Sequence, residues 1–144
     1  MCSSDNLRIG VVYRPPDASV EESMALFNYV LHNVENTKHF TVYGDFNLPD
    51  INWETLTASS NISCEFLTMC FRAGANQCVD FPTRNNNVLD LILCSDRNLI
   101  YEIQSDIPFS TSDHASIIYK MQPFIRQARN NDVRPNFKQA DYAL

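Results

Sequence analysis

Glycine is scarce in this chain, with three residues among 144, and proline is modest at seven. These low numbers exclude collagen-like, linker-like and low-complexity proteins. No apolar run approaches the length that spans a membrane, and residues 1–6 (MCSSDN) lack the basic and apolar segments of a secretory leader. We therefore expect a soluble, intracellular protein without a membrane partner.

The five cysteines lack the CxxC spacing of a zinc site, and their odd number does not suit a closed disulfide framework. Four of them lie among apolar residues, where cysteine behaves as a small hydrophobic side chain: Cys64, Cys70, Cys78 and Cys94. A reduced compartment inside the cell fits this usage.

Positive charge is also in short supply, since the formal net charge is −6 and the pI is about 4.9. This excludes a protein that holds nucleic acid by bulk electrostatic attraction alone. It does not exclude a nuclease, because a metal-dependent phosphodiesterase needs clustered carboxylates. A basic strip runs from Lys120 to Lys138, and a solvated tail is its more common explanation.

Hydrophobic residues make up 44% of the chain, enough for the core of one domain. A capping-box pattern at Ser19 to Glu22 begins the first of two expected helices, and the second should run over 62–73. The expected strands are 7–13, 40–43, 77–80, 88–94, 99–103 and 115–121. This order predicts an α/β layered fold with mixed strand directions.

Side chains suited to chemistry lie at or beside four expected strand ends. An extended path through Asp45 and Asn47 would point both the same way, with Phe46 anchored in the core on the opposite face. Asp90 interrupts an apolar run, where an unpaired carboxylate is costly. The other two groups are Tyr13 with Arg14, and Asp113 with His114. Convergence of these strand ends would give oxygen ligands that suit Mg²⁺ or Mn²⁺ and not zinc.

Four motifs follow one another in an order that resembles a known superfamily: YRPP at 13–16, GDFNLPDINW at 44–53, NNNVLDLIL at 85–93 and SDH at 112–114. The chain resembles the endonuclease/exonuclease/phosphatase superfamily, and more narrowly the apurinic-type endonuclease domain of non-LTR retrotransposon polyproteins. The resemblance implies a layered β-sandwich with flanking helices. It also implies that residues 1–122 are the C-terminal part of such a domain and that 123–144 form a tail or linker toward a reverse transcriptase domain.

The resemblance implies a role for each matching residue. Asp45 would orient or deprotonate the attacking water, while Asn47 and Tyr13 would contact the scissile phosphate. His114 would bond a phosphate oxygen while paired with Asp90, and Asp113 would lie at the metal, Mg²⁺ or Mn²⁺. Three further residues are candidates for contact with the DNA phosphate backbone, although a structural role is at least as common for each: Arg14, Thr83 and Arg84.

One departure from the superfamily bears on activity. Complete members have a first β-rich half that carries an Asn and a Glu of the metal site, and only twelve residues precede Tyr13 here. We therefore expect weak or absent nuclease activity from this chain alone, and a nuclear location when it acts in its parent element. Two alternatives stay open: a phosphatase or phosphodiesterase acting on small substrates, and a decayed or domesticated relic without enzymatic activity.

Overall fold

The computed structural model describes residues 7–122, so the expected tail over 123–144 lies outside the described residues. A four-stranded mixed sheet has the order β1-β2-β4-β3, and a two-stranded antiparallel sheet pairs β5 with β6. The strands of the larger sheet are β1 (Leu7–Tyr13), β2 (His39–Asp45), β3 (Asn76–Gln77) and β4 (Asp90–Cys94). The remaining elements are α1 (Val20–Val34), α2 (Asn61–Arg72), the 3₁₀ helix η1 (Arg97–Leu99), β5 (Ile100–Asp106) and β6 (Ser116–Met121).

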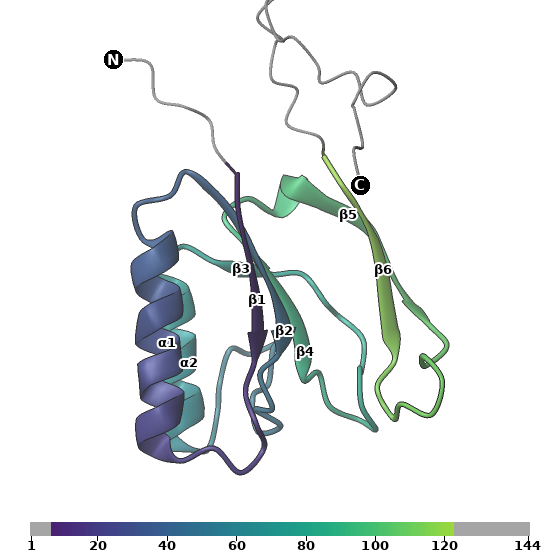
Figure 1. Ribbon diagram of the computed structural model, residues 1–144, viewed down its shortest axis with the longest axis horizontal. Coiled ribbons are helices and arrows are strands. Elements are labelled where there is room, and N and C mark those ends of the chain that lie inside the picture. Colours follow the sequence, from purple (N-terminus) through teal and green to yellow (C-terminus); the bar gives the residue numbers. More distant parts are fainter. Residues whose placement is uncertain (1–6, 123–144) are drawn as a thin grey trace, which may run out of the picture.

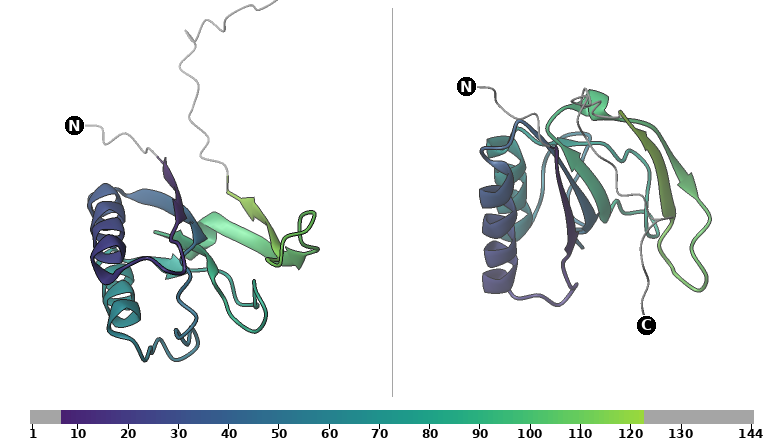
Figure 2. Two further views of the ribbon diagram at one scale, coloured as in Figure 1. Left: turned by 60° about the horizontal axis from the view of Figure 1, so that its bottom comes forward. Right: turned by 45° about the horizontal axis from the view of Figure 1, so that its top comes forward.

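These elements form three layers. Helices α1 and α2 cover one face of the larger sheet, and the β5–β6 pair lies against its other face (Figures 1 and 2). Strands β1 and β2 run parallel, whereas β4 is antiparallel to both β2 and β3. The mixed α/β fold predicted from the element order is confirmed. Among the described residues, no helix has the length and apolar character needed to cross a membrane.

The sequence of strand β4 is continuously apolar because both faces of the strand are covered. Leu91 and Leu93 belong to the core between the sheet and the helices, while Ile92 and Cys94 belong to the core between the two sheets. Successive side chains of a strand point to opposite faces, so a strand covered on both faces needs apolar residues throughout. The central position expected for this run is confirmed, because β4 lies between β2 and β3.

Helix α1 begins with the capping box that its sequence predicts. The Ser19 hydroxyl accepts from the Glu22 backbone N–H at 3.1 Å, and the Glu22 carboxylate accepts from the Ser19 backbone N–H at 2.9 Å. The bond from the Ser19 backbone holds the pKa of Glu22 below its usual value. This box fixes where the chain leaves β1 and enters the helix.

Replacing Ser19 by Ala should lower the free energy of unfolding by about 1 kcal/mol, the usual cost of losing an N-cap side chain. Urea denaturation measures this difference. Ser19→Asp should restore most of it, because aspartate is an equally good N-cap residue. A Ser19→Asp variant as unstable as Ser19→Ala would show that capping does not contribute.

Asp50 fixes the loop that leads into α2. Its Oδ2 accepts from the Ser59 and Ser60 backbone N–H groups at 3.1 and 2.7 Å, and its Oδ1 accepts from the Ser63 hydroxyl at 2.5 Å. Burial alone would raise the pKa of Asp50, but the bonds from Ser63, Ser60 and Ser59 outweigh it and hold the pKa well below its ordinary value. The ionised carboxylate therefore stabilises the folded state.

Asp50→Asn should lower the free energy of unfolding at pH 7 by about 1 kcal/mol, a figure reduced for solvent screening of this partly exposed group. A depressed folded-state pKa adds stability above the unfolded pKa, and this contribution falls as the pH drops toward the folded value. The gap between the two proteins should therefore persist from pH 7 to 5 and narrow below about pH 4. Urea titrations across this range measure it, and a gap independent of pH would contradict the assignment.

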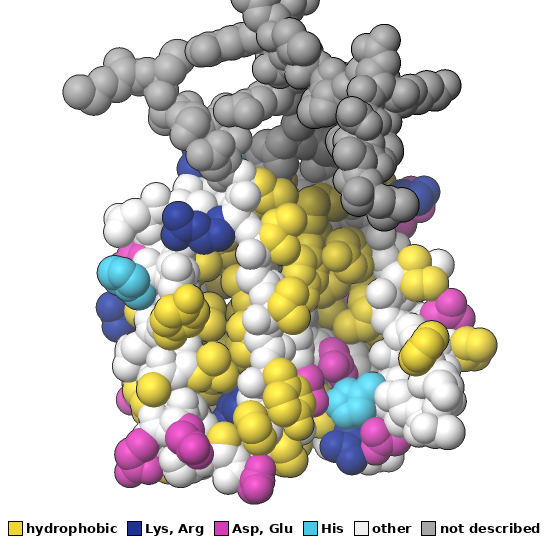
Figure 3. Space-filling model, in the orientation of Figure 1, with side chains coloured by type: hydrophobic (Ala, Val, Ile, Leu, Met, Phe, Trp, Pro, Cys, Tyr) yellow, Lys and Arg dark blue, Asp and Glu magenta, His cyan; other side chains and the backbone are white. Residues whose placement is uncertain are grey.

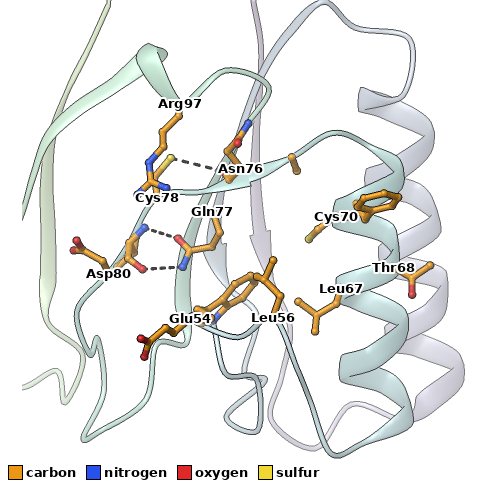
Figure 4. Close-up of a pocket in the computed structure, with 14 residues that line it drawn as sticks. Glu54, Leu56, Leu67, Thr68, Cys70, Asn76, Gln77, Cys78, Asp80 and Arg97 are labelled. Atoms are coloured by element: carbon orange, nitrogen blue, oxygen red, sulfur yellow. Dashed lines mark hydrogen bonds between the residues drawn. The ribbon is translucent and has the colours of Figure 1, made fainter.

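Strand β3 is shorter than the sequence indicates. The sequence predicts a strand over 77–80, but β3 ends at Gln77. The backbone N–H and carbonyl of Val79 are hydrogen-bonded to the Gln77 side chain and not to a neighbouring strand. The Gln77 Nε2 donates to the Val79 carbonyl at 2.7 Å, and its Oε1 accepts from the Val79 N–H (Figure 4). A hollow of about 900 Å³ opens beside this edge, between Leu56, Phe71 and Arg97. None of the residues predicted for chemistry lines this hollow.

Strand β1 presents apolar side chains on its outer face. Ile9, Val11 and Tyr13 are 59%, 83% and 65% exposed, and β2 is the strand that pairs with β1 among the described residues. Figure 3 shows hydrophobic side chains gathered over the middle of this side of the molecule. An edge strand of this kind offers free backbone groups and apolar surface to other chains.

Candidate functional site

Three strand ends meet at one end of the larger sheet. In the parallel pairing of β1 with β2, Tyr13 is aligned with Asp45, and in the antiparallel pairing of β2 with β4, Asp45 is aligned with Asp90. Two carboxylates therefore face each other across adjacent strands. Like charges in this position destabilise a sheet unless something positive lies between them.

His114 lies against both carboxylates. Its Nδ1 is 2.7 Å from Asp90 Oδ2, and its Nε2 is 3.9 Å from Asp45 Oδ2. One ligand atom from each of these three residues lies within 4.8 Å of the others. The side chains of His114, Asp90 and Asp45 are 22%, 23% and 14% exposed, so the cluster is shielded yet open to a small ligand. The structure thus brings together groups separated by up to 69 positions in the sequence (114 minus 45).

Asp45 and Asn47 lie together, but not for the reason that an extended strand would give. Strand β2 ends at Asp45, and Asn47 adopts a left-handed conformation with φ of 49°. The Asn47 backbone N–H donates to Asp45 Oδ1 at 3.0 Å, and its side-chain amide donates to Asp45 Oδ2 at 2.8 Å. Phe46 is fully buried between them, as predicted. The turn, and not strand alternation, orients the pair.

The surroundings of Asp45 act on its charge in opposite directions. Burial raises the pKa of Asp45 above the usual value, and the nearby charge of Asp90 adds to that rise. The hydrogen bonds from Asn47 and the field of His114 work against it without cancelling it. A carboxylate with a raised pKa is a better proton acceptor near neutral pH.

Arg14 is buried, and its guanidinium bonds to other parts of the protein. The residue is 6% exposed, and its Nε donates to the Ser23 hydroxyl at 2.8 Å. Its Nη1 donates to the Asn47 carbonyl at 3.1 Å, while its own carbonyl accepts from the Asn47 side-chain amide at 2.8 Å. In this arrangement the guanidinium supports the Asp45–Asn47 turn. Ser23, a second buried member of this network, carries no signal in the sequence that would have identified it.

Both hydrogens of the Asn47 amide are already donated, one to Arg14 and one to Asp45. The expected contact of this amide with a phosphate would require one of these bonds to open. Tyr13 is 65% exposed at the end of β1, so its phenol is accessible to a ligand.

The loop before β4 holds Thr83 and Arg84, and the loop before β6 holds Asp113. Thr83 is 1% exposed, so it is an interior residue of this loop. Arg84 places its Nε and Nη2 each 2.7 Å from Asp113 Oδ2. Asp113 is 64% exposed, and its Oδ1 lies 3.9 Å from His114 Nε2. Asp113 therefore borders the cluster from the solvent side.

Comparison with known proteins decides the family. A family model described as "Endonuclease-reverse transcriptase" matches residues 7–118. The chain belongs to this endonuclease family. The resemblance drawn from its four motifs is thereby confirmed, and those motifs fall within the matched region.

A solved structure shares the fold of this chain. It is the "Endonuclease domain of TRAS1, a telomere-specific non-LTR retrotransposon", with a TM-score of 0.57 and 17% sequence identity. The match covers 76% of this chain and 53% of that one, so this chain spans about half the length of the solved domain. No curated protein matches this chain. The layered α/β architecture inferred from the resemblance is confirmed by this match.

Proposed function

We propose that this endonuclease-family chain supplies the metal- and phosphate-handling part of a DNA endonuclease that hydrolyses phosphodiester bonds and nicks target DNA. The observation that carries the proposal is His114, held between Asp90 and Asp45 where β1, β2 and β4 meet. The nicked strand would carry a 3′-hydroxyl that primes reverse transcription in the parent element.

The donor groups at the site fit a hard divalent cation. Asp45, Asp90 and Asp113 offer carboxylate oxygens, and Mg²⁺ or Mn²⁺ prefers such ligands together with water. Because His114 Nδ1 is engaged with Asp90, we assign the cation to the Asp113 carboxylate on the Nε2 side, with the negative charge of Asp45 nearby. When bound, the cation would stabilise negative charge on the phosphate and lower the pKa of a bound water.

The protein's own side chains have separate tasks in this proposal. Asp90 accepts from His114 Nδ1–H and fixes the ring, so that Nε2 faces the space between Asp45 and Asp113. There the doubly protonated ring would donate from Nε2–H to a phosphate oxygen, the position where negative charge grows during hydrolysis. Asp45, whose pKa burial raises, would accept the proton of the attacking water.

Other residues orient this machinery or contact the DNA backbone. Asn47 and Arg14 hold the turn that carries Asp45. Tyr13 offers an exposed phenol to a phosphate beside Asp45. Arg84 would approach the backbone from the loop edge when its pairing with Asp113 opens.

Supercoiled plasmid, Mg²⁺ or Mn²⁺ and the purified chain provide the test. We expect slow nicking that EDTA stops and that His114→Ala abolishes. Activity should be weak because the chain spans about half of the solved domain. Nicking that survives in His114→Ala would contradict the proposal. Robust nicking by the wild-type chain would contradict the expectation that full activity needs the rest of the domain.

The arms of the same assay separate the alternatives. Phosphate release from small phosphodiesters without plasmid nicking would assign the site to a small-substrate phosphodiesterase. Failure to bind Mn²⁺ at all would support the non-enzymatic relic. A partnership with a reverse transcriptase domain, a linker at 123–144 and a nuclear location are also part of the proposal.

A further inference from the structure

Thr83 joins the two sheets at the site. Its hydroxyl oxygen accepts from the backbone N–H groups of Leu89 and Asp90, both at 3.0 Å. Its carbonyl accepts from the Ala115 N–H at 2.7 Å. Asp90 begins β4 in the larger sheet, whereas Ala115 immediately precedes β6 in the smaller one. One buried residue therefore binds the backbone beside both partners of the His114–Asp90 pair.

We propose that Thr83 is the positioning residue that sets His114 against Asp90. Its catalytic meaning rests on the function proposed above, but its geometric effect is independent of catalysis. Thr83 itself touches no reacting group, because it is 1% exposed.

The position of Thr83 is fixed by a tight turn. The Asn87 carbonyl accepts from the N–H groups of Thr83 and Arg84 at 2.9 and 3.1 Å, and the Arg84 carbonyl accepts from the Asn87 N–H at 2.9 Å. Asn85 takes the left-handed conformation, φ 52°, that asparagine tolerates better than most residues. The polar run RNNN at 84–87 therefore closes a turn that presents Thr83 inward.

The same network reaches the Asp45 side of the site. The Leu89 carbonyl accepts from the Phe46 N–H at 2.9 Å, so the segment bonded to the Thr83 hydroxyl also bonds the residue after Asp45. Arg84, the next residue, binds Asp113, the residue before His114. Thr83 thus bonds the Asp90 backbone directly, reaches His114 and Asp113 through one residue each, and reaches Asp45 through Leu89 and Phe46.

The Leu89 and Asp90 N–H groups need the Thr83 hydroxyl as their hydrogen-bond acceptor. A valine at this position would match the shape and burial of threonine but leave the Leu89 and Asp90 N–H groups without an acceptor. Unpaired amides at the start of β4 would shift the backbone that carries the Asp90 carboxylate. A serine would keep the acceptor and lose only a methyl group.

The experiment compares Thr83→Val with Thr83→Ser in the full chain. Nitrogen-15 shifts of the His114 ring, read at alkaline pH where the imidazole is neutral, report which ring nitrogen carries the proton. In the wild-type protein and Thr83→Ser, Nδ1 should carry it because Asp90 accepts the bond. In Thr83→Val the proton should move largely to Nε2. Plasmid nicking should fall by about 10–100-fold in Thr83→Val, the usual cost of losing an outer support of a site, and recover in Thr83→Ser.

Thr41→Val is the matched control. Thr41 is also fully buried and lies on β2, but its hydroxyl accepts no bond from the Leu89, Asp90 or Ala115 backbone. This variant should leave the His114 proton on Nδ1. If Thr83→Val fails to fold, amide exchange in the wild-type chain replaces it: the N–H groups of Leu89, Asp90 and Ala115 should exchange slowly, and fast exchange at all three would overturn the proposal.

The outcomes separate this inference from the proposed function. An unchanged His114 proton in a folded Thr83→Val variant overturns the positioning role, whatever the nicking activity. A displaced proton in Thr83→Val supports the role, even if the wild-type chain shows no nicking and the proposed function fails.

Discussion

Asp45→Asn should reduce metal-dependent nicking by about 10²–10⁴-fold, because the change removes the proposed proton acceptor and one charge from the cation site. The shape of the side chain is kept, and the amide oxygen of asparagine can still accept a bond from Asn47. Initial rates of plasmid nicking at fixed Mn²⁺ concentration measure the effect. Calorimetric titration with Mn²⁺ should show weaker binding in the same variant.

The Asp45→Asn variant should lose activity but should be as stable as the wild-type protein or more stable. Burial raises the pKa of Asp45, so ionising this carboxylate costs more free energy in the folded protein than in the unfolded chain, and this cost lowers the stability at pH 7. Asparagine removes this cost together with the repulsion from Asp90, and the melting temperature should stay equal or rise. A loss of activity without a loss of stability is the pattern expected of a functional residue held at a cost to the fold.

Asp106→Asn is the matched control for Asp45→Asn. Asp106 ends β5, is exposed, and contributes to none of the contacts around His114. The two variants carry the same change in net charge. Equal loss of nicking in both would point to general electrostatics, and unchanged nicking in Asp45→Asn would remove Asp45 from the mechanism.

The parts of the fold that depend on neighbours in the sequence could be predicted. The capping box at Ser19 and the doubly covered strand β4 follow from patterns a few residues long. The convergence of Asp45, Asp90 and His114 could also be predicted, since each lies at a strand end and Asp90 needed a partner inside an apolar run. These inferences used alternation, spacing and the cost of burying a charge.

The sequence does not decide the role of side chains whose partners are distant along the chain. For Arg14 both a phosphate contact and a structural role are open from the sequence, because its partners at Ser23 and Asn47 are 9 and 33 positions away. Thr83 looked like a loop residue near DNA, and only the approach of Ala115 from the other sheet shows that it is interior. The predicted length of β3 is wrong because the Gln77 side chain, and not a neighbouring strand, bonds the backbone of Val79. A polar residue in a loop pattern carries no local signal that tells exposure from burial.

Phe66→Ala should cost about 3–5 kcal/mol of folding free energy, the usual range for emptying a buried phenylalanine site. Phe66 is fully buried on α2, with ring centroids 4.9 Å from Phe27 and 4.8 Å from Phe46, and Trp53 edge-on at 6.4 Å. Its ring therefore joins α1, α2 and the loop after β2. Since domains of this size are stable by only about 5–15 kcal/mol, a substantial fraction of the variant should be unfolded at 37 °C.

The lost packing should also loosen the turn that carries Asp45 and Asn47, because Phe46 lies between them in the chain and packs directly on the Phe66 ring. Phe71→Ala is the matched control: the residue belongs to the same helix, is 88% exposed, and should change the unfolding free energy by no more than about 0.5 kcal/mol. Urea denaturation followed by circular dichroism gives both values. Similar costs for the two variants would show that the aromatic cluster around Phe66 does not hold the helices to the sheet.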